Sequence, residues 1–461
     1  MPFSFSLISL GCPKNQVDSE EMFTRLKNAG MKYVSDEDCG GADPEKALSV
    51  CVINTCGFIE AARKESIGVI MEAIEKKREG KIKYIAVAGC MVNNNLRALK
   101  EELPEVDIFI PTFDESKIAE KIALLAGKKI TGGKHKKNNT AEKFAREHFN
   151  LKRTAYLKIS EGCGRLCSFC TIPYIRGKYK SKSIEEIKNE ASYLAARGVR
   201  ELIIVSQDTS CYGQDLNIKN GLYKLLKELV RIKEIEWLRL MYLYPLKALF
   251  TDDLIELMNN EEKIQRYIDM PVQHINDGIL KLMKRGGTKK DITGLIERLK
   301  NKISGVALRT SLIAGFPGET DENFEELLEF VKDMKFDNLG VFKYSDEREA
   351  ASFKYGGKVS PKTKNARYKI LMKTQQDLLP QIFSKHIGKT YYSIIDGITN
   401  KTVKLRTYFQ SPDIDGCVNL YLRDLKPGFE INSGRGFMPV KILKAKDYDL
   451  LGVPVESYLK P

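Results

Sequence analysis

The sequence predicts an α/β protein in three parts, because two stretches alternate between strand and helix patterns and a third is rich in strands. Apolar runs alternate with amphipathic helical stretches over residues 1–126 and again over 151–345, as in parallel sheets with crossover helices. Residues 388–461 change to short Val-, Ile- and Tyr-rich runs between turns, which indicates a small, antiparallel β-barrel. A chain of 461 residues, 43% of them apolar, is long and apolar enough to bury three separate cores.

Three apolar runs in the first part, residues 1–126, predict parallel strands, and a cysteine follows each run. The runs are Phe5–Leu10, Leu48–Ile53 and Tyr84–Ala88, and the cysteines are Cys12, Cys56 and Cys90. Helical stretches at 19–28 and 61–77 separate the strands. Open α/β sheets bind ligands outside the carboxyl ends of their strands. We therefore expect the three cysteines to converge despite their distance in sequence.

The second part, residues 151–387, follows a polar and basic stretch at 127–150 that we expect to be a linker or long loop. Its strand candidates are separated by helices such as 183–197 and 322–334, and residues 361–387 look helical. The candidates are Ala155–Ile159, Glu201–Val205, Leu238–Leu243, Tyr267–Met270, Ala307–Ala314 and Leu339–Phe342. Six such repeats fit a full or partial β/α barrel, whose chemistry lies at the C-terminal strand ends. Periodicity alone leaves a doubly wound sheet open.

Composition and charge limit the kinds of binding partner and the cellular compartment that we expect for this protein. The net charge of +14 suggests an acidic or nucleic-acid-rich partner, although a lysine-rich solvated surface gives the same balance. No apolar run approaches the ~20 residues of a membrane span, and the N-terminus lacks the features of a signal peptide. We expect a cytoplasmic protein without membrane contact. Its clustered cysteines should be thiols that bind metal or act in catalysis, and four scattered histidines argue against zinc.

The strongest motif is a cysteine loop directly after the first strand of the second part. Cys163, Cys167 and Cys170 have the spacing C-x₃-C-x₂-C. Three thiolates on one short loop can hold three corners of a 4Fe–4S cluster and leave the fourth iron open to a small molecule. The alternative, a partial zinc knuckle, lacks a fourth Cys or His at knuckle spacing.

This loop resembles that of the radical S-adenosylmethionine (SAM) superfamily. The resemblance implies that the open iron binds SAM, whose reductive cleavage gives a radical that abstracts hydrogen from carbon. Together with the N-terminal cysteines and the C-terminal β domain, the chain resembles the methylthiotransferases. That family implies a flavodoxin-like first domain with an auxiliary 4Fe–4S cluster on Cys12, Cys56 and Cys90. It also implies a radical SAM barrel that is a partial TIM barrel, and a TRAM-like C-terminal domain.

Several short segments are similar to the RimO-type branch of this family, which modifies a ribosomal protein. They are 9–15, 17–20, 159–162, 206–213, 242–245, 411–416 and 447–450. The transfer-RNA branch usually carries Gln-Met at Pro13-Lys14 and Gly-Gln-Asn at 206–208. The resemblance implies that a β C–H of an aspartate in protein twelve of the small ribosomal subunit is replaced by a methylthio group. It also implies a sulfur donor and a low-potential electron donor. The alternatives are a transfer-RNA adenosine C2 methylthiotransferase and a non-catalytic iron–sulfur RNA-binding adaptor.

Two further expectations concern surfaces and SAM. Residues 388–461 carry little net charge, and we expect their aspartates to face a basic protein rather than RNA. These aspartates are Asp413, Asp415, Asp447 and Asp449. Candidate SAM contacts lie at or after barrel strand ends; they are Gln207, Gln273, Arg309 and Glu319. No catalytic acid or base is assigned, because a radical hydrogen abstraction does not require one.

Overall fold

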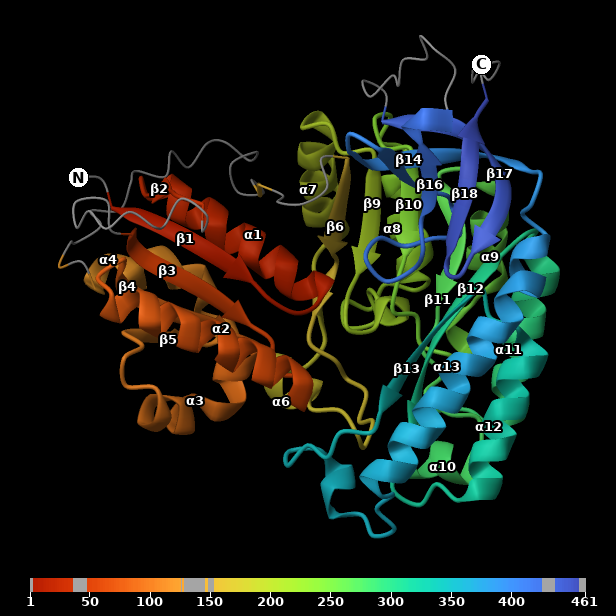
Figure 1. Ribbon diagram of the computed structural model, residues 1–461, viewed down its shortest axis with the longest axis horizontal. Coiled ribbons are helices and arrows are strands. Elements are labelled where there is room, and N and C mark those ends of the chain that lie inside the picture. The colour runs from red at the N-terminus through yellow and green to blue at the C-terminus, as the bar shows by residue number, and fades with distance from the viewer. Residues whose placement is uncertain are drawn as a thin grey trace.

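The computed structural model describes residues 3–35, 48–125, 127, 146–147, 153–424 and 436–455. Figure 1 shows three parts: the red and orange N-terminal domain, the yellow-to-cyan second domain, and the blue C-terminal barrel packed on the second domain. The expected linker at 127–150 lies outside the described residues except for 127, 146 and 147. In the part of the chain that is described, no helix is long and apolar enough to cross a membrane.

The N-terminal domain is a five-stranded parallel sheet. Its strands are β1 (Ser4–Ser9), β2 (Lys32–Tyr33), β3 (Leu48–Thr55), β4 (Ile82–Gly89) and β5 (Ile108–Ile110). The order β2-β1-β3-β4-β5 is the flavodoxin-like order, which places a ligand site where the winding reverses, between β1 and β3. The three predicted strands are confirmed, while β2 and β5 are too short to stand out in the sequence.

Helices cover both faces of this sheet. On one face lie α1 (Pro13–Asn28) and α4 (Ile118–Leu125), and on the other α2 (Glu60–Arg78) and α3 (Cys90–Glu102). Successive strand residues feed opposite cores: Val50 and Val52 pack under α1, whereas Cys51 and Ile53 pack under α2. Burial on both faces explains why β3 reads as one continuous apolar run. The side chain of Cys51 is thereby part of the core.

The second domain is a single curved sheet of six parallel strands. They are β6 (Thr154–Lys158), β9 (Glu201–Val205), β10 (Trp237–Leu240), β11 (Ile264–Asp269), β12 (Ala307–Ala314) and β13 (Asn338–Lys343). Their spatial order follows the chain order and the sheet does not close. The partial barrel is therefore confirmed, and a doubly wound sheet, which reverses its order, is excluded.

Helices alternate with these strands and pack outside the sheet (Figure 1). They are α7 (Ile184–Ala196), α8 (Gly221–Leu229), α9 (Asp252–Asn260), α10 (Asp277–Leu282), α11 (Lys289–Lys302) and α12 (Asp321–Met334). The helix α7 begins with a capping box in which Ser183 and Glu186 satisfy each other's backbone N–H groups. The longer α13 (Pro361–Ser384) then leads to the C-terminal domain.

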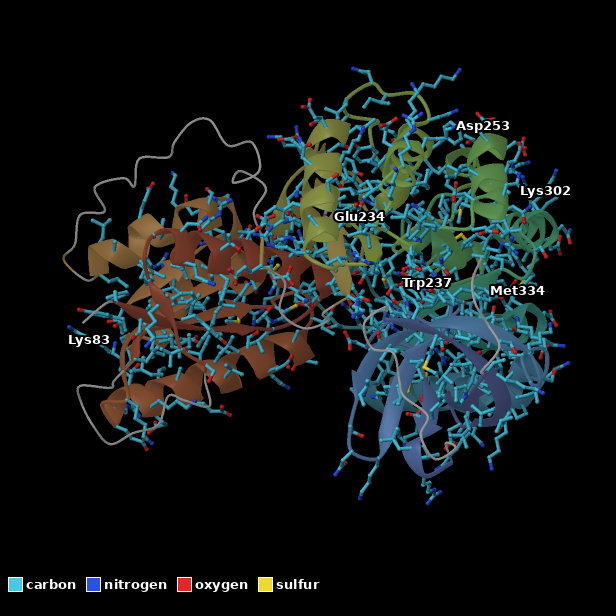
Figure 2. The ribbon with its side chains drawn as sticks, turned by 90° about the horizontal axis from the view of Figure 1, so that it is seen from above. Lys83, Glu234, Trp237, Asp253, Lys302 and Met334 are labelled. Carbon is cyan, nitrogen blue, oxygen red and sulfur yellow. The ribbon has the colours of Figure 1, made fainter. Side chains whose placement is uncertain are left out.

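The C-terminal domain is a closed five-stranded barrel. Its strands are β14 (Thr390–Ile398), β15 (Thr402–Arg406), β16 (Val418–Tyr421), β17 (Phe437–Lys446) and β18 (Asp449–Pro454). Its pairs are antiparallel except β16 with β18, which run parallel. β18 lies outside the short Val-, Ile- and Tyr-rich runs that predicted this barrel. Figure 2 shows Trp237 beside this barrel, where its ring meets Phe437 edge-on at 5.1 Å between centroids.

The expectation that the C-terminal aspartates all face a partner is wrong for Asp415. Its side chain is only 1% exposed. It accepts a hydrogen bond from Tyr267 at 2.7 Å and lies 3.4 Å from the Arg309 guanidinium. A second buried contact ties the domains: Glu201 binds Arg239 at 2.9 Å and Arg406 at 2.6 Å. Burial would raise the pKa of Glu201, but the two guanidiniums hold it at about 2.

Candidate functional site

Cys12, Cys56 and Cys90 follow β1, β3 and β4 and meet at the carboxyl edge of the N-terminal sheet. A Cβ added at Gly11 would lie 3.0 Å from the Cys56 sulfur, and one added at Gly57 would lie 2.6 Å from the Met91 Cα, next to Cys90. The three turns thus pack directly against one another. We call these three residues the dispersed triad. The three strand ends therefore converge, as the sequence predicted.

Buried side-chain amides hold these turns in place. Asn15, in the first turn of α1, donates to the Leu10 carbonyl at 2.7 Å. Asn54, at the end of β3, donates to the Asn15 carbonyl at 3.0 Å and to the Ser19 hydroxyl at 2.8 Å. Gly89 has φ +98°, and a Cβ there would meet the Asn54 side-chain oxygen at 2.3 Å. Only glycine fits between β4 and the start of α3.

Cys163, Cys167 and Cys170, the loop triad, lie on one loop after the short strand β7 (Ser160–Glu161). Backbone bonds anchor the loop: the Cys163 N–H donates to the Gly177 carbonyl and the Cys170 N–H to the Cys167 carbonyl, both at 3.1 Å. Ser168 donates its hydroxyl proton to the Leu282 carbonyl at 2.7 Å. Gly162 has φ +75°, and a Cβ there would lie 2.3 Å from the Lys178 carbonyl oxygen.

The chemistry of both triads suits a 4Fe–4S cluster. Among the described residues, no three His, Cys, Asp or Glu side chains are grouped tightly enough to hold one metal ion. A cubane cluster does not need that, because each thiolate binds its own iron. Burial raises the pKa of Cys90 and of Cys170 to about 12. Such thiols need the positive charge of a metal to bind as thiolates, and iron would supply it.

A buried ionic network joins the two domains between the triads. Arg176, at the end of α6 (Ile172–Arg176), donates from Nε and Nη2 to the Cys90 sulfur at 3.2 and 3.0 Å. The same guanidinium pairs with Asp18 of α1 at 2.6 Å and with Glu161 at 3.2 Å. Lys158 binds Asp18 and, at 2.8 Å, Glu161. Although burial alone would raise it, these cations hold the pKa of Glu161 at about 2. The network therefore contacts the dispersed triad at Cys90 and reaches Glu161, which lies two residues before Cys163 of the loop triad.

The four predicted SAM contacts differ in how many hydrogen bonds and ion pairs their side chains already make within the protein. Gln207 donates to Glu161 at 3.1 Å, and its side-chain oxygen is buried without a partner in the described structure. Gln273 has φ +72°, and its backbone pairs with β12. Arg309 pairs with Asp269 at 2.8 Å. The Glu319 carboxylate is buried, accepting from the Gly315 N–H and from Arg367 at 2.6 Å. These contacts hold Arg309 and Glu319 in place, and SAM contact stays a prediction for all four residues.

A cavity of about 450 Å³ opens between the N-terminal domain and the barrel, beside the ionic network. Its lining includes Asp18, Glu115, Lys158, Glu161 and Arg176. The Glu115 Oε1 atom is buried there without a hydrogen-bond partner among the described residues. Burial, reinforced by Asp18, raises the pKa of Glu115 well above its usual value. The junction of the two domains therefore contains a cavity that is lined by charged side chains.

The fold and the two triads define a radical SAM enzyme with an added cysteine-bearing domain. Residues 157–331 match the radical SAM superfamily, residues 4–111 match uncharacterized protein family UPF0004, and residues 387–455 match the TRAM domain. Among solved structures, the radical SAM methyltransferase TsrM from Kitasatospora setae, with cobalamin and a [4Fe-4S] cluster bound, is similar in fold. Its TM-score is 0.54 and its identity 15%, over 74% of this chain and 75% of that one.

Relatives with similar sequences show which family of radical SAM enzymes this chain belongs to. The chain is 41% identical to the ribosomal protein uS12 methylthiotransferase RimO of Clostridium novyi over 453 residues, which is 98% of each chain. It is 40% identical to the protein of the same name from Natranaerobius thermophilus, over 97% of this chain and 98% of that one. The chain therefore belongs to the RimO family of methylthiotransferases, and the family expected from the cysteine motifs is confirmed.

Sequence reasoning missed the charged residues between the triads, above all Lys14, Asp18, Glu161 and Arg176. Two signals were available. Lys14 and Asp18 are four residues apart and share a face of α1. Lys158 ends a strand, β6, in which every residue is buried, and buried lysines are rarely found unpaired. Which partners these charges meet depends on how two domains dock, and no local pattern encodes that.

Proposed function

We propose that this chain is a methylthiotransferase that replaces a β C–H of an aspartate in ribosomal protein uS12 by a methylthio group. The observation that supports this most is identity near 40% over nearly the full length to relatives named ribosomal protein uS12 methylthiotransferase. The relatives' name favours the ribosomal protein over the transfer-RNA alternative and over a non-catalytic adaptor. A sulfur donor and a low-potential electron donor are required partners in this proposal.

The residues divide into two groups by role. Cys163, Cys167 and Cys170 would hold the cluster that binds SAM, and Cys12, Cys56 and Cys90 would hold the auxiliary cluster. When bound, these groups supply the hydrogen-abstracting radical and the sulfur that is transferred. The protein's own part is to hold the two sites at one domain junction. The Arg176 network does this by binding the N-terminal domain and the barrel together.

Mass spectrometry of an aspartyl peptide from uS12 tests this function. The reconstituted enzyme is incubated anaerobically with the peptide, SAM, sulfide and reductant. We expect the peptide to gain one methylthio group in place of hydrogen. A transfer-RNA stem-loop is tested in parallel under the same conditions. Modification of the stem-loop but not the peptide would contradict the proposed substrate, and absence of 5′-deoxyadenosine with both would contradict the radical chemistry.

A further inference from the structure

Lys14 is a cation at the junction of the two domains. It is the second residue of α1, two positions after Cys12, and its side chain reaches from the N-terminal domain to the barrel. The Nζ atom lies 3.3 Å from the centroid of the Tyr242 ring, just beyond the end of β10. Among the described residues, its ammonium has no hydrogen-bond or ion-pair partner. Lys14 therefore reaches the same edge of the barrel from which the loop triad projects.

The two carboxylates that interact electrostatically with Lys14, those of Asp269 and Glu161, are already bound by other groups. Asp269, at the end of β11, accepts from Arg309 at 2.8 Å and from the Tyr242 N–H at 3.0 Å. Glu161 is shared by Lys158, Arg176 and Gln207. In the described part of the chain, the Lys14 ammonium thus has no ion-pair partner, and the carboxylates that act on it are already bound by other cations.

The contact with Tyr242 orients the Lys14 ammonium and leaves N–H groups available for hydrogen bonds. A cation held over an aromatic face keeps N–H groups that point away from the ring. Tyr242 is itself fixed, because its backbone has φ +62° and its N–H is bonded to Asp269. A non-glycine residue in that region is uncommon and persists where its surroundings hold it. The ammonium is therefore placed over the barrel edge with donors available to a ligand.

We propose that Lys14 binds the side-chain carboxylate of the substrate aspartate and so positions its β-carbon between the two triads. This assignment rests on the proposed function, whose substrate is an acidic side chain. The carboxylate is bonded directly to the carbon that reacts, so one ion pair fixes the position of that carbon. A charge-assisted hydrogen bond of this kind also selects for the acid over its amide. Lys14 is a substrate-binding residue in this proposal.

The test compares two peptides and four proteins. The peptides carry either the target aspartate or asparagine at that position. The proteins are the reconstituted wild type, Lys14→Met, Lys14→Arg and Lys83→Met. Lys83 is the matched control: it also lies over a tyrosine ring, at 5.3 Å from Tyr84, but at the outer end of the N-terminal domain (Figure 2). Peptide binding is measured by fluorescence anisotropy without reductant, so it does not depend on turnover.

We expect the wild type and Lys83→Met to bind the aspartyl peptide roughly 10- to 100-fold more tightly than the asparaginyl peptide. Lys14→Met should lose this preference, binding the aspartyl peptide as weakly as the other, and Lys14→Arg should keep part of it. In turnover, Lys14→Met should raise the KM for the aspartyl peptide. Iron content and thermal unfolding, measured on each variant, report whether the fold and clusters are intact.

Equal binding of the two peptides by the wild type would overturn the assignment without any substitution. A preference that survives in Lys14→Met would overturn it equally. Failure of the proposed function is a separate result. If the wild type binds the aspartyl peptide in a Lys14-dependent way but does not methylthiolate it, the proposed reaction is wrong, and Lys14 remains a carboxylate-binding residue without the role in positioning the β-carbon.

Discussion

The loop triad and the dispersed triad are two ways of bringing three cysteines together. The loop triad is local, because eight residues of chain carry all of its thiols and its backbone bonds anchor them. The dispersed triad needs three strands, their order and two buried asparagines before its thiols meet. The first site is specified by spacing and the second by topology, so the second should be the more sensitive to distant changes in the fold.

The two triads also differ in what faces their sulfur atoms. Cys90 receives two hydrogen bonds from Arg176, a residue of the other domain. In the loop triad, the donors come from the barrel itself: the Arg285 guanidinium donates to the Cys167 sulfur at 3.7 Å, and the Arg165 backbone N–H donates to the Cys163 sulfur at 3.4 Å. The dispersed triad is thus electrostatically tied to the barrel, while the loop triad is surrounded by the barrel's own residues.

The largest expected effect separates the roles of the triads. Cys163→Ala should abolish SAM cleavage and methylthiolation together, because it removes a ligand of the SAM-binding cluster. Cys56→Ala should abolish methylthiolation but leave formation of 5′-deoxyadenosine. Each variant should hold roughly half of the wild-type iron. Iron analysis and chromatography of the products check this. If Cys56→Ala still methylthiolated the peptide, the assigned roles would be wrong.

The next effect tests the link between the domains. Arg176→Gln leaves Asp18 and Glu161 short of a buried cation, and we expect it to cost about 3–5 kcal/mol of unfolding free energy. Arg176 and Asp18 are each only 3% exposed in their side chains, so solvent screens the pair little. Denaturant unfolding measures the loss. The exposed pair of Arg97 and Glu101 provides the control, since Arg97→Gln should change stability by less than about 0.5 kcal/mol.

A backbone substitution tests the topology of the dispersed triad. Gly89→Ala places a Cβ at φ +98° and 2.3–2.5 Å from the Asn54 side chain and the Thr55 carbonyl. We expect a loss of about 1–3 kcal/mol and of iron at the dispersed triad, with SAM cleavage retained. Gly68→Ala, in the exposed middle of α2 with no atom within 4 Å, should be neutral or slightly stabilising. Full iron retention by Gly89→Ala would show that the strand end tolerates movement.

The fold was largely predictable because burial on both faces leaves continuous apolar runs, as at Val50–Ile53 of β3 and Leu202–Val205 of β9. The loop triad followed from spacing, and the dispersed triad from strand ends. The contacts of Lys14, Arg176 and Asp415 did not follow, because each meets a partner in another domain. An aspartate that looks like a surface charge, such as Asp415, is indistinguishable in sequence from one that binds a buried arginine.

The smallest expected effect concerns thiol reactivity in metal-free protein, where the triads should respond differently to one substitution. Burial raises the pKa of both Cys90 and Cys170 to about 12. Because the thiolate reacts, alkylation of both should rise about tenfold per pH unit from pH 8 to 10, whereas an ordinary thiol levels off above about pH 9.

Arg176 opposes the effect of burial on the pKa of Cys90. Arg176→Gln should therefore raise the Cys90 pKa further and slow its alkylation at fixed pH, while Cys170 is unchanged. Peptide mapping after timed iodoacetamide treatment resolves the two cysteines, and urea-unfolded protein, in which both should level off, is the control. Equal slowing of both would mean that Arg176 acts through the whole fold rather than through its contact with the Cys90 sulfur.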